Sequence, residues 1–166
     1  RMDFLLLCMN QLINIAAKAR YMYGGQVKAP MVVRSMIGKS WGQGAQHSQG
    51  LHALFMHVPG LKVVAPSNAH DAKGCMIAAI RDDNPVIFVE HRLLYFTDAF
   101  VPEAAYTVEF GKARLRTHGN DITIVGVSNM LVECLRANEL LAEAGVSAEV
   151  IDPISLVPLD IETIRA

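Results

Sequence analysis

The sequence has almost no excess of charge of either sign. Among its 166 residues, 15 Lys and Arg nearly balance 16 Asp and Glu, which leaves a formal net charge of -1. The basic residues are also spread along the chain, so no concentrated positive surface is expected for nucleic acid or an anionic membrane. We therefore expect neither among the partners, and small molecules and other proteins remain.

Paired cysteines and long apolar runs are also missing. Cys8, Cys75 and Cys134 lie far apart and form no Cys-x-x-Cys motif, which predicts neither a disulfide framework nor a zinc site. No run approaches the roughly 20 apolar residues that span a bilayer, and no basic-then-apolar leader ends in a cleavage site. These features favour a cytoplasmic protein, or one of the mitochondrial matrix if the source is eukaryotic.

Apolar residues are nevertheless plentiful, and their spacing alternates between helical and strand periods. The expected elements are a helix over 2–23, a strand over 31–35, a helix over 51–58, a strand over 61–66, a helix from 68 or 69 to about 80 that Ser67 or Asn68 can cap, and a strand over 85–91. Strands separated by whole helices need crossover connections, so they should lie parallel in a sheet covered by helices. The predicted fold class is α/β.

A second α/β unit is expected after a linker that begins near residue 95. It has a hairpin-like piece around 107–117, a strand over 122–128, a helix over 129–144 and a strand over 147–154. Two core strands leave sheet edges uncovered, so further residues or a partner must complete this unit. We predict a first domain over 1–102, including the linker and lacking its N-terminal part, and the first part of a second domain over 103–166.

Histidine recurs every five residues at His47, His52 and His57. On a helix this spacing rotates successive side chains by about 140°, so the three cannot share one face as zinc ligands would. His47 differs from the others because a glycine-rich segment, GKSWGQG, is expected to lead into a helix there, where α/β proteins build ligand sites. That segment lacks the spacing of a phosphate loop.

An imidazole at position 47 can donate or accept a proton near neutral pH. Gln46, Ser48 and Gln49 are neighbouring polar side chains that could orient the ring by hydrogen bonds. The alternative is a histidine that only caps the start of the helix. The residues alone therefore predict an α/β ligand-binding fragment.

Three runs carry a more specific resemblance. RYMYGGQVKAPMVVRSMIG, GAQHSQGLHALFMHVPGLKVVAPSNAHDAKG and AAIRDDNPVIFVEHRLLY, in this order, resemble the beta subunit of the decarboxylating component of 2-oxo acid dehydrogenase complexes, in the pyruvate and acetoin branch. FGKARLRTHGNDITIVG and AEVIDPISLVPLD are similar to the opening of the transketolase C-terminal domain that follows in such subunits. The resemblance implies a thiamine diphosphate pyrimidine-binding domain, incomplete at its start, followed by a truncated transketolase C-terminal-like domain.

The same resemblance implies an activity and partners. Such enzymes decarboxylate a 2-oxo acid, or cleave acetoin, and pass the acyl unit to a lipoyl group. Two beta and two alpha subunits share thiamine diphosphate, alpha holds magnesium, and a lipoyl-bearing acyltransferase is the next enzyme. The alternative is a non-catalytic α/β interaction module that keeps the fold without the chemistry.

Particular residues match family positions. His47 matches a histidine that handles protons in acyl transfer, and Phe4 matches an aromatic residue that stacks on the cofactor's aminopyrimidine. A potassium site is implied at Met31, Ala79, Ile80, Asp82 and Asn84, where carbonyls at a helix end could equally bind water.

One expected residue does not fall within this sequence. The family's cofactor-activating glutamate lies upstream of the position of Arg1, and neither Glu90 nor Glu103 stands in its place. We therefore expect this fragment to be inactive by itself.

Overall fold

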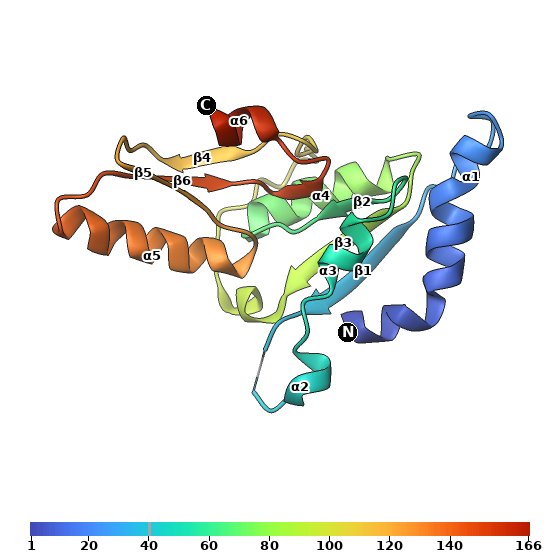
Figure 1. Ribbon diagram of the computed structural model, residues 1–166, viewed down its shortest axis with the longest axis horizontal. Coiled ribbons are helices and arrows are strands. Elements are labelled where there is room, and N and C mark those ends of the chain that lie inside the picture. The colour runs from blue at the N-terminus through green and yellow to red at the C-terminus, as the bar shows by residue number, and fades with distance from the viewer. Residues whose placement is uncertain (40) are drawn as a thin grey trace.

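The computed structural model describes residues 1–39 and 41–166 and contains two β-sheets (Figure 1). The first sheet has the strand order β1-β3-β2-β7, and the second has the order β4-β6-β5. Strands and helices alternate through most of the chain. The predicted α/β class is confirmed.

The first 96 residues supply three strands and most of the helices. In chain order they are the 3-10 helix η1 (Met2–Cys8), the π-helix η2 (Gln11–Ala16), α1 (Ala17–Met22), β1 (Val32–Ile37), α2 (Gly44–His47), α3 (His52–Met56), β2 (Lys62–Val64), α4 (Ala69–Ile80), β3 (Val86–His91) and the 3-10 helix η3 (Arg92–Phe96). The segment predicted as one helix over 2–23 is helical, but it is divided into 3-10, π and α geometry. Apolar spacing does not distinguish these geometries.

The remaining residues form β4 (Arg114–Thr117), β5 (Ile122–Val125), α5 (Asn129–Glu143), β6 (Ala148–Asp152), β7 (Ser155–Val157) and α6 (Ile161–Arg165). The hairpin predicted around 107–117 is wrong, because β4 is a single strand that pairs antiparallel with the distant β6. β5 pairs parallel with β6. The prediction also missed β7, which leaves the second unit and pairs antiparallel with β2 of the first sheet.

Parallel pairing brings the carboxyl ends of β1 and β3 together. Val32 pairs with Val86 at the start of the two strands, and Ile37 pairs with His91 at their end. The loops that follow these strands therefore leave from the same edge of the sheet, which is where open α/β sheets commonly bind ligands.

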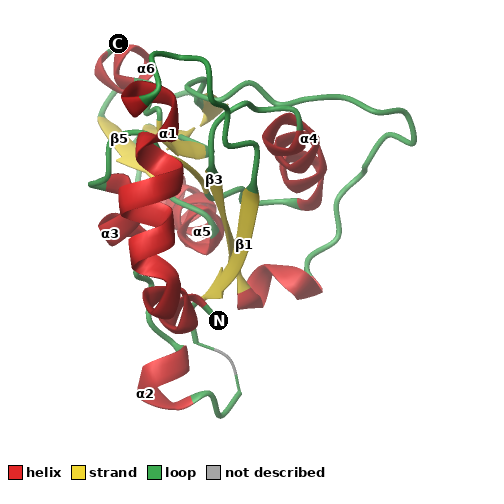
Figure 2. Ribbon diagram, turned by 90° about the vertical axis from the view of Figure 1, so that its right-hand side faces the viewer, coloured by secondary structure: helices red, strands yellow, loops and turns green. Residues whose placement is uncertain are grey.

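The first sheet is buried on both faces. Ile87 and Val89 of β3 pack in a cluster with Phe55 of α3 and with the N-terminal helical segment, while Val86 and Phe88 pack with α4. Figure 2 shows the N-terminal helical segment and α3 on one side of β1 and β3, and α4 on the other. These four β3 side chains are at most 1% exposed, and each such burial stabilises the fold by about 1.5–3 kcal/mol.

Two local features hold this arrangement. The Asn68 side chain caps α4 by accepting a hydrogen bond of 2.8 Å from the backbone N–H of Asp71. Gly60 has φ of +100°, and a Cβ there would lie 1.9 Å from the Ala17 carbonyl oxygen, so only glycine lets the chain pass the N-terminal helix before β2. Among the described residues, no helix is both long and apolar enough to cross a membrane.

Candidate active site

His47 lies beyond the carboxyl end of β1, at the last residue of the short helix α2. The prediction that the glycine-rich segment enters a helix at His47 is wrong, because the helix already begins at Gly44. The Ser48 hydroxyl donates a hydrogen bond of 2.6 Å to the Gly44 carbonyl and so stays beside this turn. Ser40, within the glycine-rich segment, lies outside the described residues.

The polar neighbours in the sequence do not orient the His47 ring. Ser48 bonds to the Gly44 carbonyl, and the Gln49 amide donates to the Gln46 carbonyl at 2.9 Å. The ring instead contacts Asp3 of η1, with 2.9 Å between His47 Nδ1 and Asp3 Oδ2. The sequence analysis missed Asp3, because no local spacing relates residue 3 to residue 47.

Phe4 contacts the same imidazole. The centroids of the Phe4 and His47 rings are 5.3 Å apart, and the ring planes are tilted by 33°. The structure thus brings together two residues that the sequence singled out separately. The Phe4 side chain is 53% exposed, which leaves aromatic surface free to stack on a planar ring.

Arg1 ties η1 to the segment that carries His47. Its guanidinium donates to the Gly38 carbonyl oxygen at 2.7 Å and also to the His47 carbonyl oxygen. Gly38, with φ of +82°, passes so close to His91 that a Cβ would lie 2.0 Å from its Nε2 atom. Burial, with a smaller contribution from the charge of Arg1, lowers the pKa of His91.

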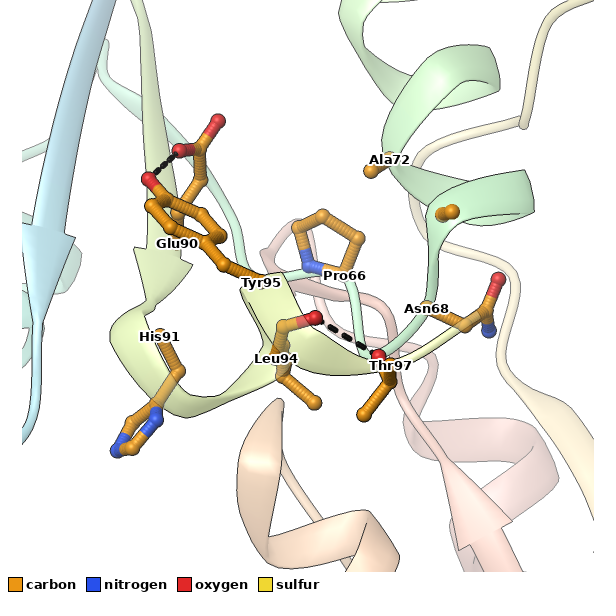
Figure 3. A pocket seen from close by; sticks show the side chains of 9 residues that line it. Pro66, Asn68, Ala72, Glu90, His91, Leu94, Tyr95 and Thr97 are labelled. Atoms are coloured by element: carbon orange, nitrogen blue, oxygen red, sulfur yellow. Dashed lines mark hydrogen bonds between the residues drawn. The ribbon is translucent and has the colours of Figure 1, made fainter. Parts of the chain in front are cut away.

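A cavity of about 230 Å³ opens along the same edge of the sheet. It lies between the carboxyl end of β3, η3 and the beginning of α4 (Figure 3). Its lining residues are Pro66, Asn68, Ala69, Ala72, Glu90, His91, Leu94, Tyr95 and Thr97. The sequence analysis placed strand ends here but predicted no cavity, because its walls come from three separate segments.

Glu90 is the charged residue of this cavity and is already paired. Arg34 donates two hydrogen bonds to its carboxylate, at 2.6 and 2.9 Å, and the Tyr95 hydroxyl donates a third. Burial, followed by the bond to Glu90, raises the pKa of Tyr95. Glu90 therefore serves as an acceptor for these two side chains.

The five positions of the implied potassium site cluster elsewhere. Ala79 and Ile80 end α4, Asp82 and Asn84 follow, and Met31 precedes β1. Because these residues adjoin the amino-terminal ends of β1 and β3, they lie at the edge of the sheet opposite to His47. A backbone hydrogen bond agrees with this placement, because the Met31 carbonyl oxygen accepts from the N–H of Val86, the first residue of β3, at 2.9 Å.

Asp82 is also engaged by protein groups. Its carboxylate accepts from Lys62 and, at 2.9 Å each, from the backbone and side-chain N–H groups of Asn84. Burial opposes its ionisation, but these hydrogen bonds outweigh burial and lower the pKa of Asp82. In the part of the chain described, no group of three or more His, Cys, Asp or Glu side chains could hold a metal ion. Main-chain oxygens would therefore have to supply most of the ligands.

Two domain descriptions match the chain. "Transketolase, pyrimidine binding domain" matches residues 2–97, and "Transketolase, C-terminal domain" matches residues 111–166. The chain belongs to the transketolase pyrimidine-binding domain family. Its Phe4, His47 and the cavity all fall within the matched pyrimidine-binding domain.

Relatives of this transketolase-family chain include subunits of two dehydrogenases. It is 48% identical over 162 residues to the beta subunit of acetoin:2,6-dichlorophenolindophenol oxidoreductase from Cupriavidus necator, which is 98% of this chain and 48% of that protein. It is 46% identical over 168 residues to the mitochondrial pyruvate dehydrogenase E1 component subunit beta-1 of Arabidopsis thaliana, which is 99% of this chain and 46% of that protein. The resemblance predicted from sequence is confirmed, and the chain spans about half the length of these relatives.

Solved transketolase structures share the fold. A split-gene transketolase, described as an inactive beta4 tetramer, superposes with a TM-score of 0.70 at 23% identity, over 99% of this chain and 58% of that one. A transketolase mutant from Pichia stipitis gives a TM-score of 0.63 at 16% identity, over 92% and 23%. At these identities the similarity establishes the transketolase fold alone.

Proposed function

We propose that this chain is part of the beta subunit of a thiamine diphosphate-dependent 2-oxo acid or acetoin dehydrogenase. The observation that carries the proposal is the contact of His47 with both Asp3 and Phe4 at the carboxyl edge of a transketolase-type sheet. The proposed reaction is oxidative decarboxylation of a pyruvate-like acid, or cleavage of acetoin, with transfer of the acyl unit to a lipoyl group.

The residues at this edge fit the proposed cofactor. Bound thiamine diphosphate supplies a stabilised carbanion and an electron sink for the decarboxylation. Phe4 would hold the aminopyrimidine ring by offset stacking on its exposed face. We assign the diphosphate and magnesium ligands to an alpha subunit, as the resemblance implies.

His47 is the residue to which we assign proton transfer. In acyl transfer the lipoyl S–S bond breaks, one sulfur bonds to the acyl carbon, and the other sulfur takes a proton. The two electrons that reduce the disulfide come from the acyl unit, which moves from the aldehyde to the carboxylic acid oxidation level. Once the ring is protonated on both nitrogens, His47 can supply the proton from Nε2 and keep the Nδ1–H that Asp3 holds.

The proposed partners are an alpha subunit, a second beta subunit and a lipoyl-bearing acyltransferase. Large apolar side chains support an oligomer, since Leu7, Tyr21 and Phe100 are 84–90% exposed and such surfaces commonly mark interfaces. We place the enzyme in the cytoplasm, or in the mitochondrial matrix if eukaryotic, because the plant relatives are named as mitochondrial. We also propose that the two domains meet near residue 102, within the segment between the two matched regions.

A potassium ion at Met31, Ala79, Ile80, Asp82 and Asn84 is a further part of the proposal. Carbonyl oxygens at the C-terminus of α4 suit a hard cation. Binding through the Asp82 side chain would require the Lys62 ammonium to move aside, because it now contacts that carboxylate.

The decisive experiment compares histidine variants of the complete beta subunit assembled with its alpha partner. His47→Ala should retain cofactor binding, measured by calorimetry, but lower the rate of acyl transfer to a lipoyl domain about 100- to 1000-fold, as removal of a general acid does. His57→Ala is the matched control, because His57 is exposed at the end of α3.

Wild-type acyl transfer in His47→Ala would contradict the role of His47. A wild-type complex that binds its partner but turns over neither 2-oxo acids nor acetoin would favour the non-catalytic interaction module.

A further inference from the structure

Asp3 was not predicted from the sequence, and the proposed reaction uses it only as a contact of His47. Its side chain is only 8% exposed, whereas that of His47 is 33% exposed. A nearly buried carboxylate requires a partner to offset the lost hydration. The partner is the imidazole, through the 2.9 Å contact between Asp3 Oδ2 and His47 Nδ1.

The backbone holds this contact from both sides. Met2, the preceding residue, is fully buried in the core that covers the first sheet. Arg1 bonds to the Gly38 and His47 carbonyl oxygens and so joins the beginning of η1 to both ends of the segment 38–47. The carboxylate and the imidazole are thus brought together by two segments that are anchored independently of the Asp3–His47 bond.

The contact determines which ring nitrogen carries a proton. An ionised carboxylate can only accept a hydrogen bond, so the Nδ1 atom of His47 must be its donor. Nε2 is then the ring nitrogen that can exchange protons with other groups, because Nδ1 is hydrogen-bonded to Asp3. Within the described residues, His47 Nε2 has no hydrogen-bond partner, and the ring also contacts the exposed Phe4.

We propose that Asp3 is a positioning residue that fixes the orientation and Nδ1–H tautomer of His47, so that Nε2 is the atom that exchanges protons in the site. This inference rests on the proposed function for its kinetic consequence. The tautomer itself does not depend on that function and can be measured without the cofactor. Asp3 touches neither the acyl unit nor the cofactor in this scheme and acts only through His47.

The first test is nitrogen NMR of the complete beta subunit with its alpha partner, labelled with [15N]histidine and free of cofactor. At a pH where the imidazole is neutral, the His47 signals should report the Nδ1–H tautomer. His47→Gln identifies these signals by their loss. Asp3→Asn should shift the population towards Nε2–H, because its amide can donate to Nδ1 as well as accept, and Asp3→Glu should restore Nδ1–H.

The second test separates two half-reactions in the loaded enzyme. Asp3→Asn should lower kcat for acyl transfer to a lipoyl domain about 10- to 100-fold, within the range of general acid–base contributions. The KM for the 2-oxo acid and the reduction of an artificial dye acceptor should stay unchanged, because neither needs a proton delivered to a leaving sulfur. Asp98→Asn, an exposed carboxyl in the linker, is the control.

The outcomes distinguish this inference from the proposed function. An Nε2–H tautomer in the wild type would overturn the role of Asp3, whatever the activity. Unimpaired lipoyl transfer in Asp3→Asn, together with impaired transfer in His47→Ala, would overturn Asp3 alone. An unimpaired His47→Ala would overturn the function assigned to His47, while the tautomer measurement would still test the contact.

Discussion

The structure describes two aspartate–histidine contacts within residues 1–39 and 41–166, and their surroundings differ. Asp3 contacts His47 at 2.9 Å, and Asp71 contacts His70 at 3.1 Å. In the part of the chain described, the Asp3 carboxylate has only the imidazole as its ionic partner. Asp71, fully buried at the start of α4, has several stronger donors.

Arginine and asparagine side chains bind both oxygens of the Asp71 carboxylate. Arg114 lies 2.8 Å from Oδ1 and Arg116 lies 2.6 Å from Oδ2, which also accepts from Asn68 at 2.7 Å. The His70 ring stacks on Tyr106, with centroids 4.6 Å apart. Each histidine contacts an aromatic ring and each side chain is 33% exposed, so the two differ in their carboxylates, of which Asp71 is already paired with two arginines. Among the residues described, no arginine pairs with the Asp3 carboxylate that contacts His47.

The side chains around Asp71 also connect α4 with the second sheet. Arg116 of β4 bridges Asp71 and Asp152, and the Ser67 hydroxyl donates to Asp152 at 2.6 Å. Both carboxylates are fully buried. In the described residues, the same residue pair thus belongs to the junction of the two sheets where arginines saturate the carboxylate, whereas at Asp3 the imidazole is the only ionic partner.

The largest expected loss of stability comes from removing the charge of Asp71. Asp71→Asn should destabilise the complete subunit by about 3 kcal/mol, near the low end for a broken buried ion pair because Arg114 remains partly exposed to water. Urea unfolding midpoints would measure this loss. Asp3→Asn, the matched change at the other contact, should cost only about 1 kcal/mol, because it replaces a hydrogen bond to a charged group by one between neutral groups. Equal losses would remove the distinction between the two regions.

Acid should weaken the same contact. Burial opposes ionisation of Asp71, but the hydrogen bonds from Asn68, His70 and Arg116 and the charge of Arg114 outweigh it and lower its pKa. A carboxyl with a lowered folded-state pKa contributes stability that is present above its unfolded pKa and lost as pH falls through the folded one. The stability difference between wild type and Asp71→Asn should therefore shrink below about pH 4.

Urea titrations at a series of pH values would check this prediction. The expected sign is a convergence of the two midpoints as the solution becomes more acidic. Midpoints that stay parallel down to the lowest accessible pH would show that Asp71 is not the titrating group.

The smallest expected effect concerns Asp82, a third aspartate whose cationic partner is Lys62. If potassium binds beside it, replacing sodium chloride by potassium chloride should stabilise the complete enzyme by about 1 kcal/mol at roughly fivefold excess over the dissociation constant. Thermal unfolding in the two salts would measure the difference, and Asp82→Ala should reduce it but not remove it, because main-chain oxygens would supply most of the ligands. Equal transition temperatures in the two salts would contradict the potassium proposal.

Local patterns were sufficient to predict most of the fold. The helix over 69–80, the strand over 85–91 and the helix over 129–144 are close to α4, β3 and α5, because apolar spacing and an Asn68 cap act within one element. β7 was missed because three residues after Pro153 carry too little periodicity. Its pairing with β2 is set by contacts between residues about 90 positions apart.

The candidate site was predicted less completely for the same reason. Phe4 and His47 were each chosen from sequence, but their contact, and the role of Asp3 between η1 and α2, depend on pairing across 43 or 44 positions. The cavity beside Glu90 likewise needs three segments to close. Sequence spacing describes one element at a time, and these features arise only where elements meet.

The pairing of β7 with β2 limits where the protein can be divided. If the chain were cut in the segment between Phe96 and Arg114, the first sheet would lose β7, and β2 would become an exposed edge strand. Such an edge is a template for pairing with other chains. Expressed without the residues that follow, the domain matched over residues 2–97 would thus be prone to aggregate, although the boundary between the two matched domains lies in that segment.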